Sequence, residues 1–217
     1  AHTGGISALQ AVGLRMEDVK TNRKAHRRFL EGCHYGFDRA QRGVGARVIA
    51  LEEQVRQLEE QLKQYRRNRD DQAKAIPYLI RVLQARQTVF RRLVDSVLFT
   101  LLAPEQWVLK YLSVDDSVHR IDPKVLRRTI EIATERNRQE RMRFALVSDL
   151  TTVVHIGDLV EVDHTSLEKR RWRVIELKEG RLNEVLTDVI EREGEPLSED
   201  TVNRIQSRFG GAAAKQV

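Results

Sequence analysis

Three charged residues in the last third of the chain have the types and spacing of a metal-dependent catalytic site. Asp158 lies in the segment HIGDLVEVD, and Glu176 and Lys178 lie two residues apart in the segment WRVIELKEG. Carboxylate oxygens are the ligands that Mg²⁺ and Mn²⁺ prefer, and a lysine beside them is able to orient a water molecule or neutralise developing charge. These residues form one site only if the fold places them side by side.

Both segments have the pattern of β-strands. TTVVHIGDLVEVD and RWRVIELKEG are rich in β-branched residues and nearly alternate, and the polar sequence HTSLEKR separates them, which predicts an antiparallel hairpin. If Asp163 pairs with Arg171, Asp158 lies directly opposite Glu176. Two facing carboxylates repel each other, and a divalent cation between them removes that repulsion. Lys178 shares the face of Glu176 because side chains alternate along a strand.

A mostly helical region is expected before these strands, up to about residue 147. Its sharpest pattern is a heptad seam, which predicts a coiled coil or one arm of a helical hairpin. The seam is formed by Val44, Val48, Leu51, Val55, Leu58, Leu62 and Tyr65. Residues 66–74 look like an exposed connector. A return helix is expected from Pro77, with Arg86 and Gln87 interrupting its apolar stripe. The partner of the seam is therefore either this return helix or a second copy.

The boundaries of the other helices follow from local signals. Thr21 to Gly45 is basic and rich in glycine, which predicts a short helix over residues 21–31 followed by a loop. Asp122-Pro123 has the pattern of an N-cap followed by proline, which predicts a helix that runs to about Leu146. The segment RLNEVLTDVIEREG after Gly180 again has a helical pattern.

Aromatic residues are interleaved with the basic residues of the first segment. Phe29, Tyr35 and Phe37 lie among its arginines. Aromatic side chains beside basic ones suit base stacking with phosphate contact. The other interpretation is that these rings pack on the protein core, and the sequence leaves both open.

The composition favours a polyanionic partner, with nucleic acid first and an anionic membrane second. The chain has 38 Lys and Arg against 32 Asp and Glu, for a formal net charge of +6. The single cysteine, Cys33, permits no disulfide within the chain, and no apolar run approaches the roughly 18 residues of a membrane span, so we expect a cytoplasmic location. The chain does not begin with methionine, and we expect it to be processed or part of a longer protein.

The pattern Asp158, seventeen intervening residues, then Glu176-Leu177-Lys178 resembles the PD-(D/E)XK nuclease superfamily. The resemblance covers roughly residues 122–217, with Gly157 in the place of the usual proline. It implies a helix, three or four strands and a further helix, and metal-dependent hydrolysis of phosphodiesters. Asp158 and Glu176 are then the ligands of Mg²⁺ (or Mn²⁺), and Lys178 completes the catalytic set.

The same resemblance implies accessory residues outside this set. A further acid on the preceding helix would be Glu135 or Glu140. His155 would be an extra ligand, and Gln216 would belong to the closing helix. Each is expected here only because members of the superfamily carry such residues.

The expected fold is therefore α+β, with a helical, coiled-coil region over residues 1–121 and a small nuclease-like core over residues 122–217. The expected function is a metal-dependent nuclease, for example in a restriction, repair or phage-defence complex. DNA is expected as its substrate ahead of RNA. The alternative is a non-catalytic coiled-coil scaffold or nucleic-acid-binding subunit; a peripheral protein on anionic membranes is weaker, because it does not explain the charged trio. Through the coiled coil we expect a homo-oligomer or a subunit of a larger complex. Phosphate contacts are expected from Arg23, Lys24, Arg27, Arg28, Arg171 and Arg181.

Overall fold

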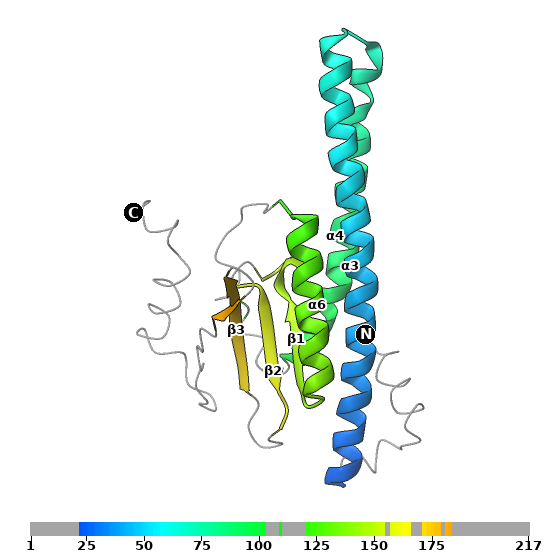
Figure 1. Ribbon diagram of the computed structural model, residues 1–217. Coiled ribbons are helices and arrows are strands. Elements are labelled where there is room, and N and C mark those ends of the chain that lie inside the picture. The colour runs from blue at the N-terminus through cyan, green and yellow to red at the C-terminus, as the bar shows by residue number, and fades with distance from the viewer. Residues whose placement is uncertain are drawn as a thin grey trace, which may run out of the picture.

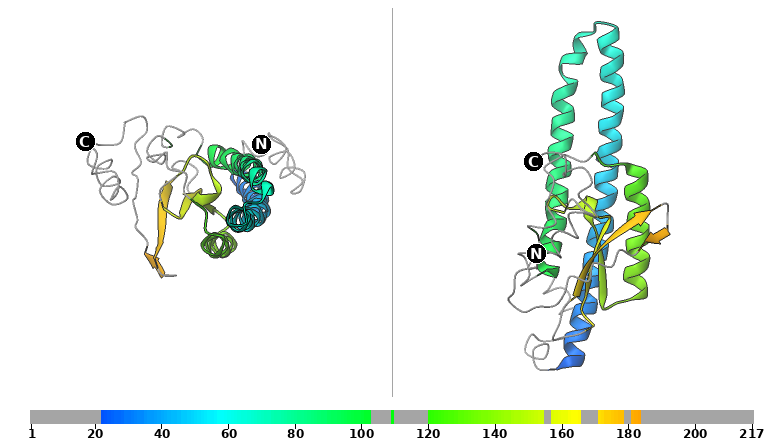
Figure 2. Two further views of the ribbon diagram at one scale, coloured as in Figure 1. Left: turned by 90° about the horizontal axis from the view of Figure 1, so that it is seen from above. Right: turned by 90° about the vertical axis from the view of Figure 1, so that its left-hand side faces the viewer.

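Two long helices form a hairpin that lies beside a third helix and an antiparallel sheet (Figure 1). The computed structural model describes residues 22–102, 109, 120–154, 157–165, 171–178 and 181–183. Helix α3 (Arg23–Arg67) and helix α4 (Ile76–Leu101) are joined by the short 3-10 helix η1 (Asp71–Lys74). The closed end of the hairpin projects beyond the other elements (Figures 1 and 2). The connector and the start of the return helix are where the sequence predicts them, and the α+β class is confirmed.

Helix α3 runs without a break through the segment for which we predicted a short helix and a loop, so that prediction is wrong. The inward face of this segment is held by tertiary contacts. The ring of Phe37 packs on Phe144 with 5.9 Å between centroids, and the amide of Gln41 donates to the backbone of Ala145 and accepts from that of Val147. These contacts outweigh the low helix propensity of glycine. Phe37 thus follows the core interpretation, whereas Tyr35 is exposed.

The heptad seam of α3 faces α4 along the hairpin. Val48 and Val55 are buried there. Gln87, which interrupts the apolar stripe of α4, turns inward and donates a hydrogen bond of 3.0 Å to the buried Glu52, whereas Arg86 is exposed. Within the described residues the seam therefore has its partner in the same chain. That the hairpin is a coiled coil, and that it joins copies of the chain, stay predictions.

Helix α6 (Pro123–Gln139) begins where the sequence predicts, because the side chain of Asp122 accepts from the backbone N–H of Lys124 at 2.8 Å. It ends before the predicted Leu146. Residues 143–147 instead form strand β1 (Arg143–Val147), and the Asn137 side chain bonds both backbone groups of Ala145. A buried run as short as Phe144–Val147 has no period that separates a strand from a helix, so the sequence misplaced the boundary.

The sheet has the order β1-β2-β3-β4, all antiparallel. Its remaining strands are β2 (Leu159–Asp163), β3 (Arg171–Lys178) and β4 (Arg181–Asn183). The predicted register is confirmed, with Asp163 opposite Arg171. Two predicted boundaries are wrong: strand β2 begins at Leu159 and not at residue 151, and residues 181–183 form a strand where we predicted a helix.

One buried apolar cluster joins the hairpin, α6 and the sheet. It includes Val48 of α3, Leu98 of α4, Leu126 of α6 and the strand residues Phe144 and Val160. The predicted division between residues 121 and 122 stays a prediction. Among the described residues, no helix is both long and apolar enough to cross a membrane.

Candidate functional site

Asp158 is fixed by the backbone on both sides of strand β2. Its N–H donates to the carbonyl of Ile175 at 2.8 Å, and its carbonyl accepts from Ser148 at 2.9 Å. Its carboxylate oxygen Oδ2 accepts from the N–H of Leu177 at 2.5 Å. Three bonds to backbone groups define where this carboxylate lies, and the last of them joins it to the residue between Glu176 and Lys178.

The backbone conformation of Gly157 allows the chain to place Asp158 where it lies. Its φ is +64°, a left-handed conformation that side chains disfavour. A Cβ at this residue would collide with Cγ1 of Val174 and lie 3.1 Å from the carbonyl oxygen of Ile175. The residue that replaces the proline of the superfamily pattern is therefore required to be glycine here.

Asp158 and Glu176 lie close enough for their charges to interact. The last pair of the β2–β3 ladder is Leu159 with Ile175, and the N–H of Asp158 bonds to the carbonyl of that same Ile175. That Asp158 lies directly opposite Glu176 therefore stays a prediction. Both carboxylates are half-buried. Lys178 is the last residue of β3, and its backbone pairs with Arg181 of β4.

A third carboxylate, which the sequence analysis missed, lies near this pair. Asp149 belongs to the 3-10 helix η3 (Ser148–Leu150), which directly follows β1. Burial raises the pKa of Asp158 above its usual value, and the charges of Asp149 and Glu176 raise it further, against the opposing effect of the Leu177 N–H. The site therefore concentrates negative charge in a half-buried place, which favours a bound cation.

Helix α4 holds the turn that carries Asp149. The buried carboxylate of Asp95 accepts from the N–H and the hydroxyl of Thr152, at 2.7 and 2.5 Å. The guanidinium of Arg91 donates to the carbonyl of Thr151 and is attracted electrostatically to Asp149 and Asp95. Because Ser148 in turn holds the backbone of Asp158, a continuous chain of contacts runs from α4 to the candidate site.

The carboxylates present suit a hard divalent cation with few protein ligands. Among the described residues, no three His, Cys, Asp or Glu side chains come close enough together to form a complete metal site. Mg²⁺ nevertheless is commonly held by one or two carboxylates, with waters and substrate phosphates completing its shell. The charge that surrounds Asp158 fits that mode of binding, with Asp158 and Glu176 as the two ligands.

Neither acid predicted on the preceding helix lies at this site. Glu140 ends α6 and pairs with Arg143 at 2.8 Å, at the end of β1 remote from Asp158. Glu135 is bonded to Arg138 and Gln139 on the exposed side of α6. These partners occupy both carboxylates, so the structure does not support a ligand from α6. His155 and Gln216 lie outside the described residues.

The predicted phosphate-binding residues lie in three places. Arg23, Lys24, Arg27 and Arg28 are exposed in the first two turns of α3, where Arg27 pairs with Glu31 at 3.2 Å. Arg171 is exposed at the start of β3, at the end of that strand opposite to Glu176. Arg181 begins β4. Arg171 thus lies away from Glu176, whereas the backbone of Arg181 pairs with Lys178, two residues from Glu176.

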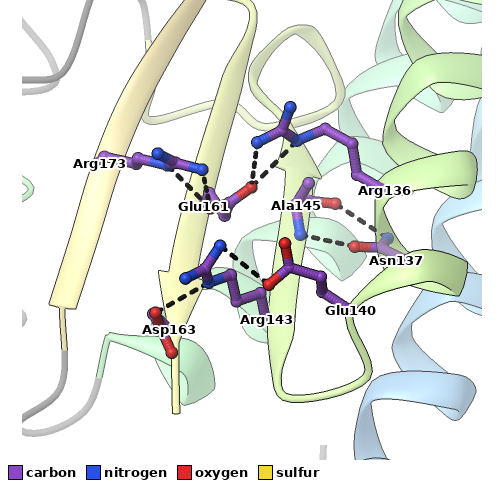
Figure 3. Close-up of polar contacts among 8 residues, drawn as sticks. All are labelled: Arg136, Asn137, Glu140, Arg143, Ala145, Glu161, Asp163 and Arg173. Carbon is purple, nitrogen blue, oxygen red and sulfur yellow. Dashed lines mark hydrogen bonds and ion pairs between the residues drawn. The ribbon is translucent and has the colours of Figure 1, made fainter. Parts of the chain in front are cut away.

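A second polar cluster lies between α6 and the sheet (Figure 3). Glu161 of β2 is only 4% exposed; one of its carboxylate oxygens accepts from Arg136 at 2.8 and 3.0 Å, and the other from Arg173 at 2.8 Å. It borders a polar cavity of about 240 Å³. Both oxygens of this buried carboxylate thus accept from an arginine guanidinium, so the charges of the cluster are paired within the protein. We assign the cluster to holding α6 on the sheet.

No protein-family model, curated protein or solved structure matches the chain. Membership of the PD-(D/E)XK superfamily therefore stays a prediction from the motif.

Proposed function

We propose that this protein is a metal-dependent nuclease that hydrolyses phosphodiester bonds, with DNA as the first candidate substrate. The observation that carries the proposal is the position of Asp158, whose half-buried carboxylate accepts from the N–H of Leu177 at 2.5 Å and lies close enough to Asp149 and Glu176 for their charges to raise its pKa. Like charges close together at a strand end are destabilising when no cation lies between them. A divalent cation bound at this site would remove the repulsion between the carboxylates.

In the proposed mechanism each residue of the chain has a separate task. Asp158 and Glu176 would hold Mg²⁺ or Mn²⁺, and the Leu177 N–H fixes the orientation of the Asp158 carboxylate. Bound Mg²⁺ makes a coordinated water more acidic and offsets the charge of the phosphodiester. Lys178, two residues after Glu176 on the same strand, is assigned to positioning the water that attacks phosphorus. Exposed arginines hold the nucleic-acid backbone.

Cleavage of DNA and RNA in Mg²⁺ tests this proposal directly. Glu176→Ala and Lys178→Ala are each expected to abolish cleavage, whereas Glu135→Ala is the matched control because Glu135 lies on the exposed side of α6. Cleavage that survives both strand substitutions would remove the site assignment. If neither the unaltered protein nor the control variant cleaves nucleic acid, the proposed nuclease activity is rejected.

A non-catalytic scaffold is the second candidate, and the α3–α4 hairpin, whose closed end projects beyond the other elements, favours it. Calorimetry with Mn²⁺ separates the two. The nuclease proposal expects binding that Asp158→Asn abolishes, because that substitution removes the charge but keeps the shape. Absence of binding at millimolar metal would favour the scaffold, with the hairpin as its functional part.

A further inference from the structure

The outer face of α4 carries apolar side chains in a regular pattern. Leu79, Val82, Val89 and Leu93 are 46%, 38%, 61% and 55% exposed. With Arg86 they follow one another at intervals of three, four, three and four residues, and these five residues are named the outer seam. Heptad spacing of leucine and valine is the pattern by which one helix binds another.

This apolar surface is concentrated on α4 and is not random scatter. In the described part of the chain, six of the eight exposed large hydrophobic residues belong to α4. The inner face of the same helix is already used, because Val94 and Leu98 lie in the core with α3 and the sheet. A helix with one partner normally exposes a polar outer face. The second apolar stripe of α4 therefore points to a second partner.

The charges on α4 determine the chemistry of that partner. Its exposed charged residues are Arg81, Arg86 and Arg92, and its one acidic residue, Asp95, is buried. Arg86 occupies the middle of the outer seam, with two apolar residues on each side. A partner that covers the seam has to neutralise this guanidinium, because an unpaired buried charge is strongly unfavourable.

A second copy of α4 does not meet this requirement. In a two-fold symmetric contact centred on the seam, each residue faces its own equivalent at the centre, so Arg86 would face Arg86 whether the helices run parallel or antiparallel. A lipid surface meets it poorly, because the apolar residues on both sides would draw the guanidinium into the hydrocarbon. An acidic side chain at the matching heptad position satisfies it directly.

We propose that the outer seam docks an amphipathic helix of a partner protein whose apolar stripe carries a Glu or Asp opposite Arg86. Leu79 and Val82 on one side, and Val89 and Leu93 on the other, contact the apolar residues of that helix. Arg81 and Arg92 favour further acidic residues along its edge. The evidence for this docking surface is independent of the proposed nuclease activity.

The test uses a fluorescent synthetic helix of about four heptads, long enough to fold on the surface, with leucine at its seam, glutamate at the central seam position and glutamate along its edges. A matched peptide has lysine at each glutamate position. By fluorescence anisotropy, the protein is expected to bind the glutamate peptide at least about tenfold more tightly than the lysine peptide, because like charges in contact are strongly unfavourable. Arg86→Glu is expected to reverse this preference.

Two apolar substitutions locate the contact. Val89→Gln is expected to weaken binding of the glutamate peptide about tenfold, whereas Val125→Gln, at a residue of α6 that is 52% exposed, is expected to leave it unchanged. Equal binding of both peptides, no binding, or no reversal by Arg86→Glu would overturn the proposal. Seam-dependent self-association in sedimentation velocity, or seam-dependent cosedimentation with anionic vesicles, would also overturn it and assign the seam to a second copy or to a membrane.

Discussion

Substitution of Gly157 by alanine tests how Asp158 is positioned. Gly157 has φ +64° and precedes Asp158 directly. An alanine Cβ would collide with Cγ1 of Val174, which is 3% exposed and has no space to move into. We expect Gly157→Ala to destabilise the protein and to displace the Asp158 carboxylate from its bond with Leu177.

The expected magnitude is the sum of two separate costs. A side chain in the left-handed region costs about 1–2 kcal/mol, and forcing an extra methyl group into a packed site costs about 1–3 kcal/mol. The free energy of unfolding should therefore fall by about 2–5 kcal/mol, which in a chain of this length lowers the melting temperature by roughly 4–20 °C. Affinity for Mn²⁺ should fall as well, because the carboxylate moves.

The assay is urea-induced unfolding followed by far-ultraviolet circular dichroism, with Gly43→Ala as the matched control. Gly43 lies inside α3, and a Cβ there would meet no atom within 4 Å. The control should therefore gain about 1 kcal/mol from helix propensity. If Gly157→Ala leaves stability unchanged or raises it, the required left-handed turn and the packing against Val174 are refuted.

Three further substitutions test the electrostatics, each by urea unfolding at several pH values. Asp158→Asn should raise the free energy of unfolding at neutral pH, because burial raises the pKa of this carboxyl in the folded state. This gain in stability should shrink as the pH falls through the raised pKa and vanish below the ordinary pKa of an aspartate. A loss of stability at neutral pH would contradict the prediction. Glu161→Ala should cost about 3 kcal/mol, because Arg136 and Arg173 lose their shared carboxylate; a cost below about 1 kcal/mol, typical of exposed pairs, would show that the cluster is not structural. Burial lowers the pKa of His34, so the free energy of unfolding should fall as the pH drops from the ordinary histidine pKa of about 6.5 to the lowered pKa of the folded state. His34→Gln should flatten this pH dependence. An unchanged pH dependence would show that another residue causes it.

The register of strands β2 and β3 was predictable because few registers bury the apolar residues of both strands. Val160, Val162 and Val174 alternate with polar residues, and a shift of one residue would expose the apolar set. That constraint fixed Asp163 opposite Arg171 and brought Asp158 within reach of the charge of Glu176. The cap at Asp122 was predictable for a similar reason, since its pattern depends only on adjacent residues.

Features that depend on distant contacts were not predictable. The helix over residues 23–67 persists because its inward face packs on the sheet, and Gly45 lies so close to Ile130 that a Cβ there would collide with it. Read locally, the same glycines indicate a loop. Asp149 was missed because β1 was assigned to a helix; once residues 143–147 are a strand, an acid that follows it at the Asp158 end of the sheet becomes a candidate.

Helix α4 connects the two surfaces for which functions are proposed. On its inner side, Asp95 and Arg91 hold residues 151 and 152, and through Ser148 they support the backbone of Asp158. On its outer side it carries the outer seam, which ends at Leu93, between those two residues in sequence. A partner that shifts or rotates this end of α4 necessarily acts on the bonds to Thr152. The same helix therefore has the contacts needed to relate what binds the hairpin to the position of the candidate catalytic carboxylate.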